Sequence, residues 1–556
     1  MSSEKDNPED LLAAAVRRHK SGRLDSARTF YREYLAARPD DAGGRHLCGL
    51  LGLQMGRFDE AAAMFRRAVE LNPAFAEAHN NLGNALQQTG DAGDAAAAIA
   101  AFRRAAESDP GLFDAHYNLA GALRAAGDGE AAEESYRLAL KIIPDSVPAL
   151  GNLAALLEGL NRTEDAQTIA EKGLGTAPLD PLLNLTAAKL ERRAGKLKAG
   201  IERLDTLLAH PLAPPLDPDM ETGGRFELGR LYDRAGRPDD AYGQFARANR
   251  MQRRKSRRHG IDKNRYLATV GILSRRFSRQ WVAGWTTVTA DRADQTPVFL
   301  VGFPRSGTTL LDRILRGHPK ITVMEEKGPV SDMRNAAALL PGGYPECLAD
   351  LSAEDIGELR RVYFAAAAKH VDLETIKDGD ILADKMPLNI VDAGLIVRVF
   401  PGARFILSLR HPADVALSCF MRAFAVNEPM ANFFSLDDAA RLYAEVMGLW
   451  RRYLDTLDIL MIACHAIRYE DLVADTEGEI RRVVDFLKLD WQPDMLDFAA
   501  RARKRGSIST PSYAQVSEPI YIRASGRWRR YADYLAPVMG RLRPFIEEFG
   551  YGEDGE

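Results

Sequence analysis

The first half of the chain has apolar residues at helical spacing and almost no strand-like alternation. Within it, a small residue, an aromatic residue, a second small residue and a proline recur in the same order. Small residues let two helices approach closely, the ring fills the space between successive hairpins, and proline ends the second helix. The pattern therefore predicts a series of helical hairpins. It is clearest in three consecutive sets: Ala61, Phe65, Ala68 and Pro73; Ala98, Phe102, Ala105 and Pro110; and Ala132, Tyr136, Ala139 and Pro144.

The spacing of turn residues indicates that these hairpins repeat. Gly22, Gly56 and Gly90 are 34 residues apart, and the same interval separates Pro39 from Pro73, Pro110 from Pro144 and Pro144 from Pro178. The irregular interval is three residues longer, and its extra residues fall within 91–97, at a turn between two helices where an insertion costs least. The array resembles the tetratricopeptide repeat family over roughly residues 8–210, in about six repeats, and a seventh, weaker hairpin is expected around Phe226–Asn249.

After residue 295 the pattern changes to short apolar runs that alternate with helical segments, which predicts a parallel sheet covered by helices on both faces. Strands are expected at Val298–Val301, Arg404–Arg410 and Ile459–Arg468. The predicted fold class is an N-terminal all-α repeat superhelix followed by an α/β domain. Its expected boundaries are 1–250 for the repeats, 251–294 for a basic helical linker and 295–556 for the α/β domain.

The first predicted strand leads into a loop bounded by Gly302 and Gly307, and then into an amphipathic helix. Such a loop presents backbone N–H groups and the positive end of a helix dipole to an anion. The phosphate-binding loop of nucleotide hydrolases has a lysine after its second glycine, and Thr308 and Thr309 follow that glycine here. A γ-phosphoryl transfer with magnesium would lack its usual clamp. A less negative sulfuryl group could be held by N–H groups, two hydroxyls and Arg305, without a metal.

Two features of the first half concern partners. A repeat superhelix usually binds an extended protein or peptide on its concave face. Asn81, Asn118 and Asn152 share one repeat position and form a candidate ladder for a peptide backbone; alternatively, asparagine is simply common at this position. The basic run at 250–264 either steers an acidic or nucleic partner or serves as a solvated connector, which we favour.

Composition narrows the class of protein. The chain has 556 residues, of which 46% are apolar and 27% charged, as in soluble globular proteins of two to four domains. Its net charge of −4 gives no overall reason to expect a nucleic-acid partner. Cys48, Cys347, Cys419 and Cys464 are too far apart in the sequence to suggest a zinc site or a disulfide framework. The polar N-terminus and the lack of a long apolar run predict a cytoplasmic protein without a membrane partner.

Two motifs of the second half resemble those of sulfotransferases that use 3′-phosphoadenosine 5′-phosphosulfate (PAPS). The run Pro304–Thr309 resembles their 5′-phosphosulfate loop, and Leu409–Ser418 resembles their 3′-phosphate motif. The resemblance covers roughly residues 296–550 and implies PAPS as co-substrate, with no metal required. It implies that the donor is bound by Arg305, Ser306, Gly307, Thr308, Thr309, Arg410, Ser418 and Arg422.

Within that family, Thr309–Pro319 and the glutamate pair that ends at Glu326 are similar to the tyrosylprotein branch. The resemblance implies Glu326 as the base that takes the acceptor hydroxyl proton. It implies Lys385 as the charge that stabilises the leaving phosphate oxygen, and Ser512 as a hydrogen-bond donor in the transition state. The further nucleotide contacts that it implies are Tyr469 and Arg527, which stands where the tyrosylprotein branch has lysine, a change that keeps the charge but alters the geometry.

The leading hypothesis is therefore a PAPS-dependent sulfotransferase whose repeat array recruits a protein acceptor. Tyrosylprotein sulfotransferases of animals are membrane-anchored and disulfide-bonded, and they have an arginine after the glutamate pair where Lys327 stands here. Peptide tyrosine, glycan and small-molecule acceptors all stay open, as does a homodimer. Two alternatives are a nucleotide-dependent kinase, which Thr308 disfavours, and a non-catalytic nucleotide-binding scaffold, which the joint presence of Glu326 and Lys385 disfavours.

Overall fold

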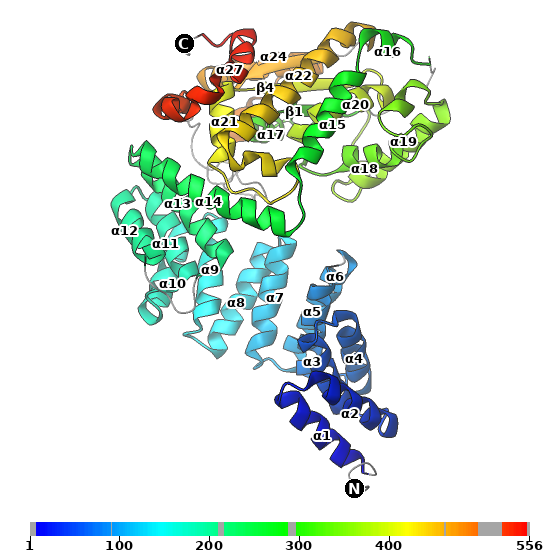
Figure 1. Cartoon of the computed structure of the whole chain (residues 1–556), viewed down its shortest axis with the longest axis vertical. Helices are drawn as coiled ribbons and strands as arrows, with labels where there is room; N and C mark the ends of the chain where they lie inside the picture. Colours follow the sequence, from blue (N-terminus) through cyan, green and yellow to red (C-terminus); the bar gives the residue numbers. More distant parts are fainter. Residues whose placement is uncertain are drawn as a thin grey trace. The chain divides into compact units, whose positions relative to one another are not determined.

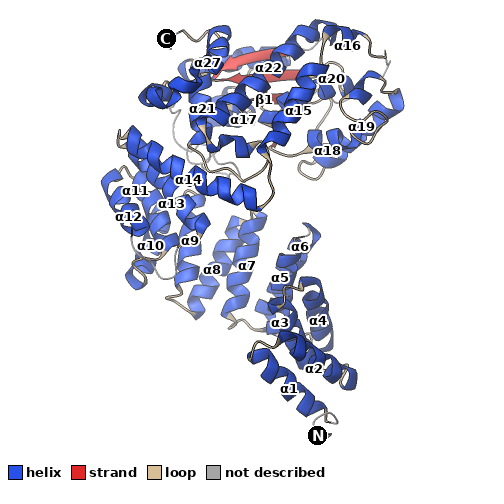
Figure 2. Ribbon diagram, viewed as in Figure 1, coloured by secondary structure: helices blue, strands red, loops and turns tan. Residues whose placement is uncertain are grey.

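The structure is a computed structural model that describes residues 7–90, 92–209, 216–286, 296–460, 463–498 and 525–552 (Figures 1 and 2). The chain forms two compact units, Met1–Arg203 and Leu204–Glu556. The described part of the first unit is helical, and the second unit combines helices with a five-stranded parallel sheet. The predicted fold class, a helical repeat region followed by an α/β domain, is confirmed.

The first unit is a series of helical hairpins. Each hairpin turns through a residue with left-handed backbone, and φ lies between 64° and 87° at Gly22, Gly56, Gly90, Gly127, Asn161 and Gly195. Glycine adopts this conformation without a steric penalty, which explains the regular spacing of these residues in the sequence. The helices, of which α12 continues into the second unit, are α1 Pro8–Lys20, α2 Leu24–Ala37, α3 Ala42–Gln54, α4 Phe58–Leu71, α5 Ala76–Thr89, α6 Ala92–Ser108, α7 Phe113–Ala126, α8 Gly129–Ile142, α9 Val147–Gly159, α10 Thr163–Thr176, α11 Pro181–Arg193 and α12 Leu197–Ala209.

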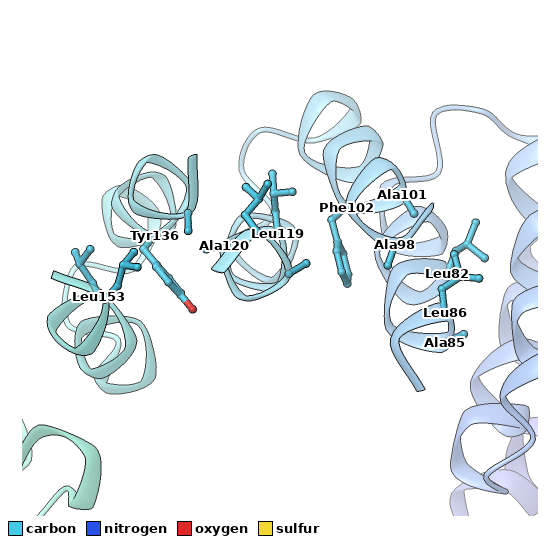
Figure 3. Close-up of a cluster of buried hydrophobic side chains, with 14 of the residues drawn as sticks. Leu82, Ala85, Leu86, Ala98, Ala101, Phe102, Leu119, Ala120, Tyr136 and Leu153 are labelled. Atoms are coloured by element: carbon cyan, nitrogen blue, oxygen red, sulfur yellow. The ribbon is translucent and has the colours of Figure 1, made fainter. Parts of the chain in front are cut away.

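Aromatic rings fill the spaces between neighbouring helices of this unit (Figure 3). Phe102 and Tyr136 are almost fully buried, and each lies among leucine and alanine side chains of the adjacent helices. A Cβ atom on Gly83 would lie 2.5 Å from Cε1 of Phe102, and one on Gly49 would lie 2.6 Å from Cε1 of Phe65. The close approach of ring and helix therefore requires glycine at these two positions, which lie outside the recurring sets named from the sequence.

The three asparagines of the candidate ladder hydrogen-bond within the array. The side-chain nitrogen of Asn81 is 2.9 Å from Nε2 of His46 in the preceding repeat. Asn118 donates to Oδ1 of Asn80 at 3.0 Å, and Asn152 donates to the Tyr117 hydroxyl at 2.9 Å. Each amide thus joins two successive repeats. This arrangement favours the interpretation that the repeat itself requires asparagine at this position.

The sheet of the second unit has the strand order β2-β3-β1-β4-β5, and all neighbouring strands are parallel. Alternate residues of the strands face opposite layers of helices. Val298 and Leu300 pack against α17 and α24. Phe299 contacts Phe405, which in turn contacts Trp450 of α22 on the other face. The strands are β1 Val298–Gly302, β2 Ile321–Glu325, β3 Ile381–Lys385, β4 Arg404–Leu409 and β5 Ala463–Arg468.

The second unit has many helices around this sheet (Figure 2). Its α-helices are α13 Pro218–Arg234, α14 Pro238–Arg258, α15 Lys263–Arg276, α16 Arg279–Ala283, α17 Thr308–Leu315, α18 Pro329–Ala337, α19 Ala353–Ala367, α20 Ala393–Val399, α21 Pro412–Phe420, α22 Leu436–Leu460, α23 Tyr469–Ala474, α24 Thr476–Leu487 and α27 Ala532–Glu548. Its 3-10 helices are η1 Glu346–Ala349, η2 Leu373–Thr375, η3 Pro387–Asp392, η4 Met430–Phe434, η5 Pro493–Asp497 and η7 Arg527–Tyr531.

The strand predictions are correct in part. β1 and β4 lie where they are expected, but the expected strand at 459–468 begins only at Ala463, because α22 extends to Leu460. A continuous apolar run does not show where a helix ends and a strand begins. β2 and β3 were not predicted, because they end in charged residues, whereas β1, of the same length, is apolar up to its final glycine.

The seventh hairpin, α13 and α14, repeats the packing of the first unit, since a Cβ atom on Gly229 would lie 2.7 Å from Cε1 of Phe245. The division between units nevertheless falls at 203/204, before this hairpin, and differs from the expected boundary at 250. α14 packs against the α/β part of the second unit: Asn249 donates to the carbonyl oxygen of Phe420 at 2.8 Å, and the Tyr242 and Phe420 rings are stacked.

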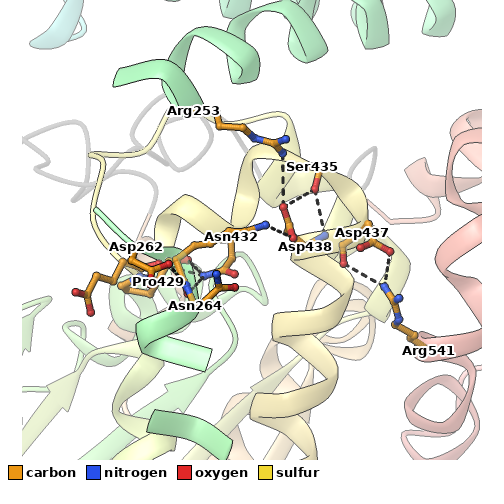
Figure 4. Close-up of polar contacts among 11 residues, drawn as sticks. Arg253, Asp262, Asn264, Pro429, Asn432, Ser435, Asp437, Asp438 and Arg541 are labelled. Carbon is orange, nitrogen blue, oxygen red and sulfur yellow. Dashed lines mark hydrogen bonds and ion pairs between the residues drawn. The ribbon is translucent and has the colours of Figure 1, made fainter. Parts of the chain in front are cut away.

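The basic run is likewise part of the packed second unit. Arg253 and Lys263 both form ion pairs with Asp438 at the start of α22. Figure 4 shows the contact between Arg253 and Asp438. Asn432 also donates to the carbonyl oxygen of Lys263 at 3.2 Å. The segment expected as a connector therefore forms the end of α14, α15 and α16. Among the described residues, no helix is long and apolar enough to cross a lipid bilayer.

Candidate active site

The loop between β1 and α17 packs closely against the backbone of β4 and the side chain of Tyr469. A Cβ atom on Gly302 would lie 2.6 Å from the carbonyl oxygen of Ser408 in β4, and one on Gly307 would lie 2.9 Å from Cδ2 of Tyr469. Gly307 also has a φ of 111°, which favours glycine. The Ser408 hydroxyl donates to the carbonyl oxygen of Ser306 at 3.0 Å. Both bounding glycines are thus required by close contacts, and the loop is held to β4 by the Ser408 hydrogen bond.

This loop has hydrogen-bond donors suited to an anion. Ser306 is 2% exposed, and its Oγ has no hydrogen-bond partner among the described residues. Thr308 begins α17 and is 4% exposed, and Thr309 follows it. The first N–H groups of a helix have no acceptor within the helix and carry partial positive charge. The loop residues that were predicted to bind the sulfuryl donor therefore present N–H and hydroxyl groups close together.

Arg305 and Arg410 connect the loop with the last turn of α21, where Ser418 lies, and with the residues just before that helix. Arg305 donates from Nε to the Ser418 hydroxyl at 3.1 Å, and Arg410 donates from Nη1 to the carbonyl oxygen of Arg305 at 3.4 Å. The Arg410 guanidinium also lies over the Tyr469 ring, 5.1 Å from its centroid. The structure thus brings together four residues that were predicted from two distant motifs and a strand end: Arg305, Arg410, Ser418 and Tyr469. Arg422, half-buried, follows the end of α21 by two residues.

Positive charge is concentrated at this point. The pKa of Arg305 is lowered to about 10, first by burial and also by the positive charges of Arg410 and Arg527, while Cys419 and Tyr469 oppose the shift. Guanidinium groups that disfavour one another's charge are stabilised by a shared anion. The cluster therefore fits a phosphate or sulfate group.

Glu326 and Lys385 form an ion pair at the ends of β2 and β3. Lys385 is fully buried, and its Nζ donates to Oε1 of Glu326 at 2.7 Å and to Oε1 of Glu325 at 3.4 Å. The Glu326 N–H donates to the carbonyl oxygen of Lys385 at 2.8 Å. Glu326 has a left-handed φ of 48°, and its side chain is 37% exposed. The structure thus fixes the backbone of this glutamate and leaves its carboxylate accessible.

The neighbouring Glu325 has a different environment. Its side chain is 14% exposed and lies 3.7 Å from Arg313 and 3.5 Å from Arg316, besides its contact with Lys385. Burial raises the pKa of Glu325, but the charges of Lys385, Arg313 and Arg316 outweigh burial and leave the pKa below its usual value. Glu325 therefore remains an ionised partner of buried cations, and Glu326 is the better candidate for proton transfer.

The strand register places these groups on one edge of the sheet. Lys385 pairs with Glu325 of β2 and with Leu300 of β1, and Gly302 of β1 pairs with Ser408 of β4. The loop, the Glu326–Lys385 pair and Arg410 all lie at or just beyond carboxyl ends of parallel strands. This is the edge at which open α/β sheets bind ligands.

The segment before α27 docks beside this edge. Asp414 accepts hydrogen bonds from the backbone N–H groups of Gly526 and Trp528, both at 2.8 Å. The Trp528 ring stacks on His411, with ring centroids 4.9 Å apart and planes 7° apart. Burial and the charges of Arg529 and Arg410 lower the pKa of His411 to about 4, so its ring is neutral at pH 7. Ser512 lies outside the described residues.

Arg527 itself pairs with Asp233 of α13, through Nε at 3.2 Å and Nη2 at 2.6 Å. Its expected nucleotide contact stays a prediction. Asp233, Ser408 and Asp414 support the site and were not singled out from the sequence. Ser408 and Asp414 flank or lie within the 3′-phosphate motif, which could have drawn attention to them. No local pattern in the sequence identifies Asp233, because it lies in the repeat hairpin, 294 residues from its partner Arg527.

Comparison with known proteins shows which protein families the two parts of the chain match. Residues 297–493 match the sulfotransferase family, and residues 51–90, 90–147 and 123–190 match tetratricopeptide repeat families. The chain carries N-terminal tetratricopeptide repeats and a sulfotransferase-family domain that is distantly related to protein-tyrosine sulfotransferases.

Several individual proteins are similar. An uncharacterized protein of Aquifex aeolicus is 24% identical over 445 residues, which cover 77% of this chain and 54% of that protein. Protein-tyrosine sulfotransferase 1 of Danio rerio is 24% identical over 45% of this chain and 72% of its own length. YrrB, whose structure was described as a tetratricopeptide repeat protein with an unusual peptide-binding site, is 18% identical over 32% of this chain and 91% of its own, with a TM-score of 0.29.

Proposed function

We propose that this protein transfers a sulfuryl group from PAPS to an acceptor hydroxyl, and that the acceptor class is a protein or peptide, with tyrosine as the first candidate. The observation that carries the proposal is that the Arg305–Arg410–Ser418 cluster and the Glu326–Lys385 pair occupy one edge of the sheet. Membership of the sulfotransferase family supports PAPS as the donor, and the repeats support a protein acceptor.

The residues present fit such a donor. The close contacts at Gly302 and Gly307 keep the loop free of side chains there, and the buried Ser306 hydroxyl has no hydrogen-bond partner among the described residues. Arg305 and Arg410 supply charge for anionic groups. When bound, the donor supplies the sulfuryl group and leaves as adenosine 3′,5′-bisphosphate. The Ser306–Thr309 loop, Arg410, Ser418, Arg422, Tyr469 and Arg527 would hold it.

The acceptor proton would go to Glu326. Its carboxylate is accessible and is oriented by the hydrogen bond from Lys385, and a positioned carboxylate of this kind accelerates a reaction about 10²–10⁴-fold as a general base. As the acceptor oxygen bonds to sulfur and the bond from sulfur to the phosphate oxygen breaks, the fixed cations Lys385 and Arg305 would stabilise the charge on that phosphate oxygen.

Titration calorimetry and a transfer assay test this function. The full chain should bind adenosine 3′,5′-bisphosphate and should not bind ATP with magnesium, because ATP has no 3′-phosphate for Arg410 and the loop has no lysine for the γ-phosphate. Labelled PAPS and host lysate should give labelled polypeptide. In Glu326→Gln we expect transfer to fall at least about 100-fold with bisphosphate affinity kept.

Glu325→Gln is the comparison variant, since it removes the adjacent carboxylate. It should lower the melting temperature more than Glu326→Gln does, because Glu325→Gln removes a buried partner from three cations, whereas Glu326→Gln weakens one ion pair of Lys385. Binding of ATP with magnesium in preference to the bisphosphate would indicate a kinase. Full transfer by Glu326→Gln would exclude Glu326 as the base, and label only in glycans or small molecules would exclude a protein acceptor.

A further inference from the structure

Asp233 links the last repeat hairpin to the segment beside the donor site. It lies in the final turn of α13 and is 6% exposed. Its carboxylate accepts from Nε and Nη2 of Arg527, from Nη2 of Arg530 at 3.2 Å and from the Tyr531 hydroxyl at 2.7 Å. Its carbonyl oxygen accepts from Nη1 of Arg530 at 3.0 Å. Every one of these donors belongs to η7.

The same short segment is also held by α21 and the residue before it. The N–H groups of Gly526 and Trp528, on either side of Arg527, donate to Asp414, and Trp528 stacks on His411. Arg527 is thus fixed between two anchored neighbours and by Asp233. Its charge acts on Arg305 of the loop, where it helps to lower the pKa.

The hairpin also contacts the end of α21 that bears the predicted 3′-phosphate residues. Phe420 stacks with Tyr242, and its carbonyl oxygen accepts from Asn249 of α14. Phe420 lies between Ser418 and Arg422 in the sequence. The hairpin therefore supports both elements around the candidate nucleotide site.

The geometry of the Asp233–Arg527 pair suggests what the carboxylate does. The Asp233 carboxylate accepts from Nε and Nη2, on one side of the Arg527 guanidinium group. Nη1 can then donate to another acceptor. A guanidinium is planar, so a carboxylate on one edge fixes the direction of the remaining N–H groups. An acid near an anion site would by charge alone weaken anion binding. The presence of Asp233 near the site is explained if its effect on the orientation of Arg527 outweighs the effect of its negative charge.

We propose that Asp233 is a positioning residue of the donor site, which holds Arg527 so that its free edge meets the nucleotide, and that the last repeat hairpin is thereby a required part of that site. The inference rests on the proposed function.

Asp233→Asn tests the inference because it is nearly isosteric. Titration calorimetry of the full chain with adenosine 3′,5′-bisphosphate should show about tenfold weaker binding than in the wild type. If Asp233 acts only as a nearby negative charge, the same substitution should strengthen binding. Unchanged or tighter binding would overturn the proposal.

A double-mutant cycle separates positioning from a general structural role. In an Arg527→Ala background, Asp233→Asn should have no further effect on bisphosphate affinity. A persisting loss would mean that Asp233 acts through another residue and would overturn the proposal. Arg530→Ala is the matched control: it removes a second arginine from Asp233 and should leave the affinity within about twofold.

Two further outcomes are informative. If Asp233→Asn does not fold, Arg527→Lys serves as the test variant in its place, because lysine keeps the charge but cannot form the two-point contact with Asp233. Arg527→Lys should also weaken bisphosphate binding about tenfold. Unchanged affinity in this variant would overturn the proposal. A wild-type chain that does not bind the bisphosphate would overturn the proposed function and this inference together. Normal wild-type binding with no effect of Asp233 would overturn the inference alone.

Discussion

Arg305 and Glu326 both have left-handed backbone, with φ of 74° and 48°. Asn161 and Lys488 are the other non-glycine residues with positive φ in the described part of the chain, and both lie where a helix ends. A left-handed non-glycine residue costs about 1–3 kcal/mol, and such residues cluster at functional sites. Arg305 lies in the loop between β1 and α17, and Glu326 lies beside Lys385. Their left-handed backbone therefore agrees with the roles proposed for them.

Asp384 gives a prediction about pH. It precedes Lys385 in β3, is fully buried, and accepts a hydrogen bond from Tyr363 at 3.0 Å. Burial raises its pKa to about 7, against the opposing effect of that hydrogen bond. The native carboxyl therefore keeps its proton at pH values where the unfolded one has lost it. As pH rises from about 4 to about 7, the wild type should lose up to roughly 4 kcal/mol of stability relative to Asp384→Asn.

Urea unfolding at pH 5 and pH 8 would measure this difference. All five tryptophans follow residue 280, so their fluorescence reports on the second unit alone. The variant should gain stability over the wild type at pH 8 far more than at pH 5. Asp378→Asn, at an exposed position before the same strand, should show no such change. Parallel pH profiles for wild type and Asp384→Asn would contradict a raised pKa.

At the scale of elements, the repeats depend on a small residue facing each ring. Alanine at Gly83 would place a Cβ atom 2.5 Å from the fully buried Phe102 ring. The ring or the helix would have to shift within a packed core, so Gly83→Ala should destabilise the first unit by roughly 1–3 kcal/mol. Gly121 lies within α7, and a Cβ atom there would meet only the Tyr136 hydroxyl, at 3.9 Å.

Gly121→Ala should therefore have the opposite sign and stabilise the first unit by roughly 0.5–1 kcal/mol, because alanine is the better helix former. Scanning calorimetry of the full chain checks both variants, and tryptophan fluorescence identifies the transition that belongs to the second unit. A stability increase in both variants would show that the contact with Phe102 does not limit packing.

The elements that sequence patterns missed share a physical feature. β3 contains Asp384 and Lys385, whose side chains are fully buried although their charges suggest a surface loop. Their burial is compensated by Tyr363 on one face of the sheet and by Glu326 on the other. These partners are remote in sequence, so local hydrophobicity could not predict the strand. β1 is apolar throughout and was predicted for that reason.

At the scale of the whole molecule, α13 and α14 look like repeats in sequence but belong to the unit with the sheet. A chain that begins at Lys196, before α12, keeps both helices and should unfold cooperatively with bisphosphate affinity near that of the full chain. A chain that begins at His259 exposes Phe420 and removes Asp233 from Arg527. It should aggregate or lose the cooperative fluorescence transition in urea.

The control for both truncations is the full chain under the same conditions. Equal stability and equal bisphosphate affinity in the chain that begins at His259 would show that the hairpin is dispensable. That result would also favour the boundary at 250 that the sequence pattern suggests.

The sequence alone predicted the repeats, the glycine-bounded loop after β1 and the two motifs that resemble those of sulfotransferases. Each is a local pattern, in which spacing along one helix or one turn sets the geometry. The tertiary structure decided which strands adjoin, and so which side chains meet at the edge of the sheet. It also decided that Asp233 pairs with Arg527, 294 residues away. Contacts over such separations depend on how the whole unit folds, and no local pattern in the chain specifies them.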